Sequence, residues 1–313
     1  MDENSTIQIN HVNVSTHKGT IKQPVDSVTL DSRGIQGDAH AGAWHRQVSL
    51  IAQKSLEVFY QQTGRRIHPG EFAENLTIEG MDLTRVNLLD RFVKAEVILE
   101  VTQLGKKCHG DDCAIFREVG KCAMPEEGVF TRVIQGGQLF PGDKLEYRPK
   151  SYRVMVITLS DRAAAGHYPD KSGPKIGQKV ERHLTGLFPH VSVERMVISD
   201  DQGRLLNALQ QAKKQAYDVV FTTGSTGIGS RDIGPETTRL LMDKEIPGIM
   251  EMVRMKYGRD KPAALLSRSV AGVMDHTLVY ALPGSSRAVG EYLEVILPTL
   301  HHSLMMVHDL DVH

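Results

Sequence analysis

A glycine-rich loop directly after a buried-strand pattern constrains the fold of this chain most. Residues 222–232 read Thr-Thr-Gly-Ser-Thr-Gly-Ile-Gly-Ser-Arg-Asp and follow the apolar segment 217–221. Glycines and small hydroxyl residues cannot build a core, but they can bring backbone N–H groups close to an anion. Pro235 then favours the start of a helix. Strand, glycine loop and helix in this order predict an anion site at a sheet end; the alternative is a glycine-rich turn without a ligand. The loop matches neither the dinucleotide nor the Walker pattern.

Composition and charge exclude several classes of protein. The 313 residues favour two domains. Lys and Arg total 37 against 38 Asp and Glu, which argues against a nucleic-acid-binding surface spread over the protein. An apolar run of about 18 residues is missing and the N-terminus is polar, so we expect neither a membrane span nor a secretory signal. Three cysteines make no disulfide framework. We therefore expect a cytoplasmic protein.

The second half alternates strand and helix patterns. Strands are predicted over 153–159, 191–198 and 218–222, and helices over 175–188 and 204–216. This rhythm predicts a three-layer α/β domain over residues 151–313 with a mainly parallel sheet. A last helix over 286–307 should be bent or interrupted near Pro298. Ligands of such sheets bind at the carboxyl ends of the strands, and the loops after all three strands lie there.

The first half has a different pattern. Short apolar stretches at 25–30, 48–51, 93–101 and 129–134 are separated by turn signals. They predict a mostly antiparallel β barrel over residues 1–150, with one helix at 53–63. The boundary falls near residues 147–152.

Five aspartates occupy predicted loops of the second half: Asp161, Asp170, Asp200, Asp201 and Asp232. Any one of them fits a helix cap as well as a catalytic group. Their convergence beside a phosphate-type loop points to Mg²⁺ held by one or two carboxylates together with phosphate oxygens. The ligand is then a nucleoside triphosphate, or two phosphorylated molecules bind.

Motifs of the second half resemble the molybdopterin adenylyltransferase family of molybdenum cofactor synthesis. They are 159–162, 168–173, 198–202, 222–232 and 282–285, in the family's order and spacing. The resemblance implies that Asp200 and Asp232 are catalytic and hold Mg²⁺. It implies that the substrates ATP and molybdopterin are bound by Ser160, Asp161, Ser172, Thr223, Gly224, Ser225, Thr226, Gly227, Ser230, Pro283, Gly284 and Ser285. The family loop more often has glycine where Ser225 stands, and we expect the loop to tolerate the serine.

The implied reaction is the adenylylation of molybdopterin by ATP with release of pyrophosphate. The family also implies a homotrimer and contacts with other proteins of molybdenum cofactor synthesis. Two alternatives stay open. The domain either binds and passes on molybdopterin without catalysis, or it inserts molybdate into adenylated molybdopterin.

All three cysteines lie between residues 108 and 122. The cysteines lack the paired spacing that is typical of zinc sites. The plain alternative is that they are buried and structural. Two lysines before Cys108 favour a reactive thiolate there. This half resembles the MOSC domain family at 34–42, 45–46, 70–76, 108–122, 127–133 and 141–143. The resemblance implies the handling of molybdenum cofactor or sulfur, with Cys108 as the catalytic cysteine.

Overall fold

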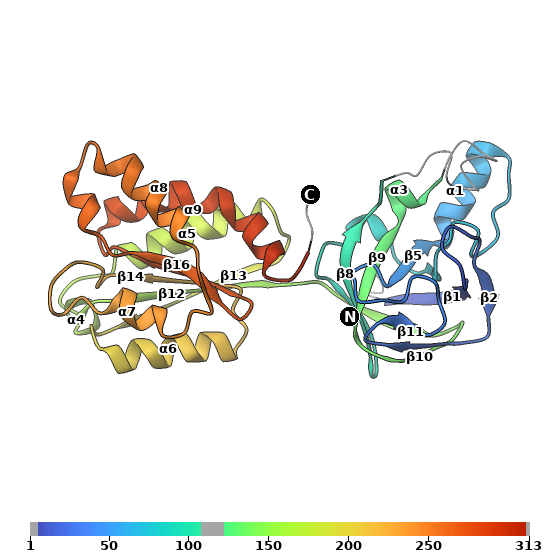
Figure 1. Cartoon of the computed structure of the whole chain (residues 1–313), viewed down its shortest axis with the longest axis horizontal. Helices are drawn as coiled ribbons and strands as arrows, with labels where there is room; N and C mark the ends of the chain where they lie inside the picture. Colours follow the sequence, from blue (N-terminus) through green and yellow to red (C-terminus); the bar gives the residue numbers. More distant parts are fainter. Residues whose placement is uncertain (1–5, 108–121, 311–313) are drawn as a thin grey trace. The chain divides into compact units, whose positions relative to one another are not determined.

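The computed structural model describes residues 6–107 and 122–310. The chain divides into two compact units, residues 1–150 and 151–313, called here the N-terminal and C-terminal units (Figure 1). Within the described ranges, no helix is both long and apolar enough to cross a bilayer.

The N-terminal unit is a closed β barrel. Its strands follow one another in the order β11 (Lys144–Arg148), β7 (Arg91–Lys94), β8 (Val97–Leu104), β9 (Val129–Gln135), β5 (Val48–Ala52), β6 (Leu76–Glu79) and β1 (Thr6–Val14). A pairing of β1 with β11 closes this ring, and β2 (Gln23–Val25) adds to β1 outside it. Among the described strands of this unit, only β5 and β6 pair in parallel. The barrel prediction is confirmed.

Apolar side chains fill the barrel because alternate residues of each strand point inward. Ile7, Leu50, Ile78 and Leu99 are among its fully buried members. A small sheet of β10 (Gly137–Leu139), β3 (Val28–Asp31) and β4 (Gly34–Ile35) completes this unit's strands. The predicted helix is α1 (Gln53–Thr63), followed by η2 (Leu83–Arg85) and α3 (Met124–Glu127).

The C-terminal unit contains a sheet of six strands. Their order is β13 (Val191–Ile198), β12 (Tyr152–Leu159), β14 (Val219–Thr223), β17 (Thr277–Leu282), β16 (Val270–Met274) and β15 (Lys244–Glu245). The first three pairings are parallel. The last two are antiparallel, so the sheet is mixed.

Helices lie on both faces of this sheet (Figure 1). They are α4 (Asp161–Ala164), α5 (Ser172–Thr185), α6 (Gln202–Lys214), α7 (Gly234–Arg239), α8 (Pro247–Gly258), η4 (Pro262–Leu266) and α9 (Ser286–Met306). The predicted interruption of α9 was wrong, because the helix continues through Pro298, while the predicted bend stays a prediction. Proline removes one helical hydrogen bond, but the fully buried Ile296 and Leu300 on either side anchor both halves of α9 to the core.

Candidate functional site

A cavity of about 810 Å³ lies where β12, β14 and β17 end. These neighbouring strands are parallel, so their carboxyl ends and the loops that follow meet at one edge of the sheet. The predicted site residues that line it are Ser160, Asp161, Asp200, Gly224, Ser225, Thr226, Gly227, Asp232, Pro283 and Gly284. The structure therefore brings residues from five separate sequence motifs together.

The glycine loop depends on close backbone packing. Gly224 has a φ of 108°, and a Cβ there would lie 2.3 Å from the carbonyl oxygen of Leu159. Ser225 also has a positive φ, 55°, which is unfavourable for a residue with a side chain. Its Oγ donates to the carbonyl of Arg231 at 3.0 Å and accepts from the N–H of Ile233 at 2.8 Å. The serine hydroxyl thus closes the loop onto the start of α7.

Two carboxylates of the cavity lining, those of Asp200 and Asp232, interact electrostatically. Asp232 Oδ2 accepts a hydrogen bond from the N–H of Gly229 at 2.8 Å. A Cβ on Gly227 would lie 2.7 Å from this same oxygen, so glycine leaves room for the carboxylate. Burial raises the pKa of Asp200, and the charge of Asp232 raises it further. The ionised form of the half-buried Asp200 is therefore less stable here than in water.

The structure separates the aspartates that cap helices from those that line the cavity. Asp201 Oδ1 accepts from the N–H of Arg204 at 2.8 Å and caps α6. Asp170 accepts from the N–H groups of Ser172 and Gly173 at 3.0 and 3.1 Å at the start of α5. Neither Asp170 nor Asp201 lines the cavity. The capping hypothesis therefore applies to these two residues.

Asp161 links the loop after β12 to the loop after β13. The Asp161 N–H donates to Asp200 Oδ2 at 3.1 Å, and the Asp200 N–H donates to Asp161 Oδ1 at 3.0 Å. Asp161 also forms an ion pair with the exposed Arg231. This exchange fixes the backbone at both aspartates, and Arg231 compensates the charge of Asp161 rather than that of Asp200.

Four predicted ligand residues lie outside the cavity lining: Ser172, Thr223, Ser230 and Ser285. Thr223 is buried, and its hydroxyl donates to the carbonyl of Pro283 at 2.8 Å. Ser172 is bound to Asp170, and Ser285 is the N-cap residue of α9. The side chains of Thr223 and Ser172 thus hold loops next to the cavity.

Sequence reasoning missed several cavity residues. Arg162, Tyr168 and Arg231 line it and add two cations and an aromatic ring. The Tyr168 hydroxyl lies 3.0 Å from Ser160 Oγ, and the Arg162 guanidinium lies 5.5 Å from the Tyr168 ring centroid. All three residues stand inside the quoted motifs, so membership of those motifs was the signal that could have identified them.

The donor set fits a magnesium ion that is shared with phosphate. Among the described residues, no group of three or more His, Cys, Asp or Glu side chains could hold a metal alone. Asp200 and Asp232 supply two carboxylates whose mutual repulsion a divalent cation would relieve. Phosphate oxygens of a substrate would complete the coordination, as is usual for Mg²⁺.

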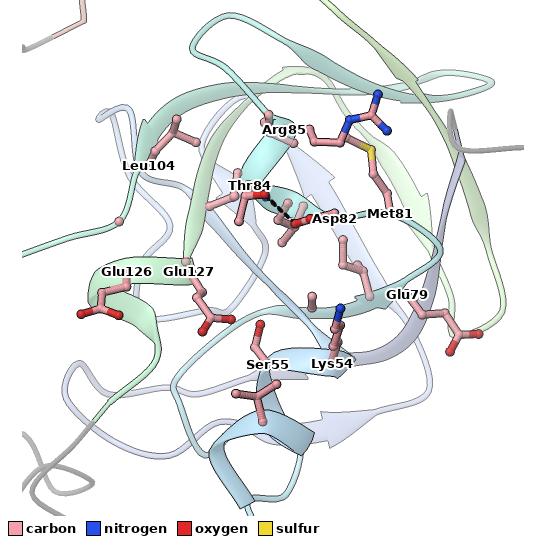
Figure 2. A pocket seen from close by; sticks show the side chains of 18 of the residues that line it. Lys54, Ser55, Glu79, Met81, Asp82, Thr84, Arg85, Leu104, Glu126 and Glu127 are labelled. Carbon is pink, nitrogen blue, oxygen red and sulfur yellow. Dashed lines mark hydrogen bonds between the residues drawn. The ribbon is translucent and has the colours of Figure 1, made fainter. Parts of the chain in front are cut away.

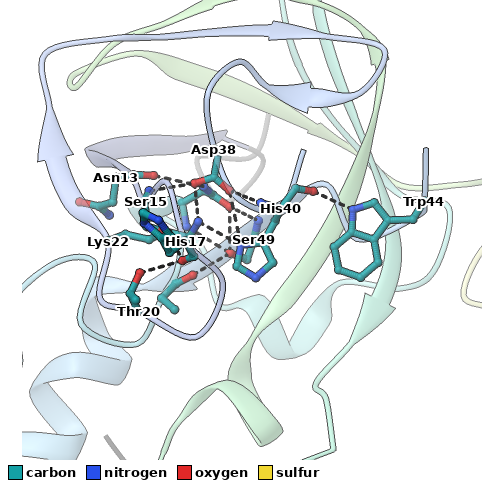
Figure 3. A network of polar contacts seen from close by, with 11 residues as sticks. Asn13, Ser15, His17, Thr20, Lys22, Asp38, His40, Trp44 and Ser49 are labelled. Carbon is teal, nitrogen blue, oxygen red and sulfur yellow. Dashed lines mark hydrogen bonds and ion pairs between the residues drawn. The ribbon is translucent and has the colours of Figure 1, made fainter. Parts of the chain in front are cut away.

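A buried polar network lies in the N-terminal unit (Figure 3). Lys22 Nζ is 2.5 Å from Asp38 Oδ2, and both side chains are fully buried. Asn75 Nδ2 donates to the same oxygen at 3.2 Å. Burial alone would raise the pKa of Asp38, but hydrogen bonds from His40 and Lys22 outweigh it and lower that pKa below its usual range. The network brings the motif segments 34–42 and 70–76 together. Lys22 was missed because it lies outside every quoted motif.

A cationic and aromatic group adjoins this network. His40 stacks on Trp44 with ring centroids 6.2 Å apart, and the Arg46 guanidinium lies 4.9 Å from the Trp44 centroid. Lys18 Nζ lies 5.4 Å from the same ring. Such a surface suits an anion that carries a planar ring. Cys108, the predicted catalytic cysteine, lies outside the described residues.

A second cavity of about 760 Å³ lies in the N-terminal unit (Figure 2). Ala52 and Glu79, the last residues of β5 and β6, line it. Asn75 of the polar network directly precedes β6, and β5 and β6 are parallel. The cavity and the network therefore lie at opposite ends of these strands. Its wall combines Lys54 and Arg85 with acidic side chains.

Comparison with known proteins finds a family model that matches part of each unit. Residues 155–302 match the family described as a probable molybdopterin binding domain, and residues 37–146 match the MOSC domain. A molybdopterin adenylyltransferase of Pyrococcus furiosus is 40% identical over 161 residues, which cover 50% of this chain and 91% of that protein. A molybdenum cofactor biosynthesis bifunctional protein of Synechococcus elongatus is 36% identical over 50% of this chain and 47% of its own length.

Other matches cover the same half. Gephyrin of Dictyostelium discoideum is 32% identical over 51% of this chain, but this chain spans only 23% of gephyrin. A solved structure of the molybdopterin biosynthesis Mog protein from Mycobacterium ulcerans is 34% identical over 50% of this chain and 99% of that chain, with a TM-score of 0.46. Through its C-terminal unit, the chain belongs to the molybdopterin adenylyltransferase family.

Proposed function

We propose that the C-terminal unit adenylylates molybdopterin with ATP in a Mg²⁺-dependent reaction of molybdenum cofactor biosynthesis. The observation that carries the proposal is the convergence of Asp200 and Asp232 beside the glycine loop in one cavity. Family membership supports the same reaction, since relatives that align along most of their length are named molybdopterin adenylyltransferase.

The chemistry requires positioning rather than a protein nucleophile. A phosphate monoester is largely dianionic at neutral pH, because its second pKa is about 6. An oxygen of the molybdopterin phosphate attacks the α-phosphorus of ATP, and the bond from that phosphorus to the oxygen bridging to the β-phosphate breaks. The electron pair leaves with pyrophosphate. The protein holds two anions together and offsets their charge.

The residues of the cavity divide this work. Asp200 and Asp232 would hold Mg²⁺, which supplies positive charge to the phosphates when bound. Amides of the loop 224–227 and the exposed Arg162 and Arg231 face the same cavity and offset further negative charge. Tyr168 offers an aromatic face to a planar ring of either substrate.

Pyrophosphate release from ATP and Mg²⁺, measured with and without molybdopterin, tests the proposal. We expect release only when molybdopterin is present, with Asp232→Asn reducing it by about 100-fold or more. Asp201→Asn is the matched control, because asparagine caps helices as well as aspartate does and Asp201 lies outside the cavity. Tight molybdopterin binding without any pyrophosphate release would instead identify a carrier protein.

We propose that the N-terminal unit handles the same cofactor or its sulfur. Two observations support this proposal: residues 37–146 match the MOSC domain, and a cationic, aromatic surface surrounds Trp44. Cys108→Ser should abolish any transfer by this unit and leave pyrophosphate release unchanged. Transfer that persists in Cys108→Ser would exclude this cysteine from the reaction.

We propose that the protein is a cytoplasmic homotrimer. Large apolar side chains of α8 and η4 are more than half exposed: Met252, Met255, Leu265 and Leu266. Such a surface is typical of contacts between subunits. Light scattering should give three times the 34.7 kDa mass of one chain. Met255→Lys should reduce this mass, and a monomeric wild-type protein would contradict the proposal.

A further inference from the structure

We infer that Arg268 is a positioning residue that holds the glycine loop and Asp232 in their working geometry. This inference rests on the proposed function of the C-terminal unit. Arg268 lies between η4 and β16, far from the loop in sequence and outside all motifs quoted above. Its backbone N–H donates to the carbonyl of Thr226 at 3.0 Å.

The guanidinium group joins three further points. Nε donates to the carbonyl of Gly227 at 2.5 Å, and Nη2 donates to the carbonyl of Asp232 at 2.5 Å. Nη1 pairs with the Glu236 carboxylate on α7. One side chain therefore connects the middle of the loop, its end and the helix that follows.

The segment that carries Arg268 is itself held in place. Ser269 is buried, and its hydroxyl lies 2.9 Å from that of Ser267. Arg254 of α8 donates to the carbonyl of Ser267 at 3.3 Å. The strand β16 begins at Val270 in the core of the sheet. Arg268 therefore fixes the position of the loop relative to the sheet.

Only arginine fits this arrangement. Its three nitrogens carry donors in a rigid planar fork, whereas lysine has one nitrogen on a flexible chain. Lysine keeps the charge near Glu236 but cannot reach all three acceptors together. An electrostatic role of Arg268 would survive Arg268→Lys, and a positioning role would not.

Hydrogen exchange and kinetics on the full chain test the inference. Arg268→Lys should speed amide exchange at residues 226–234 by about tenfold or more. It should lower kcat by about 10- to 100-fold, with smaller changes in the KM of ATP and molybdopterin. Arg239→Gln is the matched control, because Arg239 pairs with Glu245 on the surface and lies outside the cavity. Glu236→Gln keeps an acceptor for Nη1 and should have a smaller effect than Arg268→Lys.

Two results would overturn the inference. One is wild-type kcat and loop exchange in Arg268→Lys; the other is faster exchange throughout the C-terminal unit, which shows general destabilisation. The exchange measurement needs no turnover. If the wild-type protein releases no pyrophosphate, the proposed function fails. The exchange measurement still tests whether Arg268 holds the glycine loop in place.

Discussion

Ser225 allows a quantitative test of how the glycine loop is built. Its hydroxyl makes two hydrogen bonds, to Arg231 and Ile233, while its backbone stays in the left-handed region. Each bond contributes about 0.5–1.5 kcal/mol, so Ser225→Ala should cost about 1–3 kcal/mol and keep the backbone strain. Ser225→Gly loses the same bonds but relieves strain of about 1–2 kcal/mol. We expect the glycine variant to be the more stable of the two by about 1 kcal/mol.

Thermal unfolding monitored by calorimetry can resolve this difference. For a unit of this size, about 1 kcal/mol corresponds to a Tm difference of about 2–4 °C. Trp44 is the single tryptophan of the chain and lies in the N-terminal unit. Its fluorescence transition should be the same in both variants and serves as an internal control. An alanine variant as stable as wild type, or more stable than Ser225→Gly, would refute the reasoning.

Two further variants and one labelling experiment probe the candidate sites. Burial and the charge of Asp232 raise the pKa of Asp200 in the folded protein. The folded protein therefore loses stability as the pH rises through the unfolded-state pKa of this carboxyl group. Asp200→Asn should therefore raise Tm at pH 7 while it reduces pyrophosphate release; a lower Tm with activity retained would contradict this. Gly227→Val should displace the Asp232 carboxylate and weaken ATP binding in calorimetric titration, and unchanged affinity would exclude the loop from binding. Cys108 should be alkylated faster than Cys113 or Cys122 at neutral pH, as peptide mapping by mass spectrometry can show.

Patterns that repeat along the chain predicted much of the fold. Helix α1 begins and ends at the predicted residues, and β13 also matches its predicted range. Strand β1 escaped prediction for a physical reason. Its register shifts between Ile9 and His11, so apolar residues fall at 7, 9, 12 and 14 instead of at every second position. A bulge of this kind hides the alternation that marks a strand.

Motifs predicted where the candidate site lies but not which side chains face it. Thr223 and Thr226 stand in the same loop motif, yet Thr223 binds the Pro283 carbonyl and only Thr226 lines the cavity. Likewise, Asp200 lines the cavity while the adjacent Asp201 caps α6. Adjacent residues point in different directions, and a one-dimensional motif does not contain that information. Arg268 was beyond prediction because its partners come from a distant part of the sequence.

Three energetically unfavourable features of the C-terminal unit lie at the glycine loop and its cavity. Asp200 carries a carboxylate whose ionised form the fold disfavours, and Ser225 holds a strained backbone. Thr222, at the base of the loop, has a buried hydroxyl without a hydrogen-bond partner among the described residues. Each feature costs stability, and such costs concentrate where a protein binds ligands or performs chemistry. A divalent cation and phosphate groups would relieve the charge repulsion at Asp200. These features of the residues themselves support the proposed site at this edge of the sheet, beside the support that family membership gives.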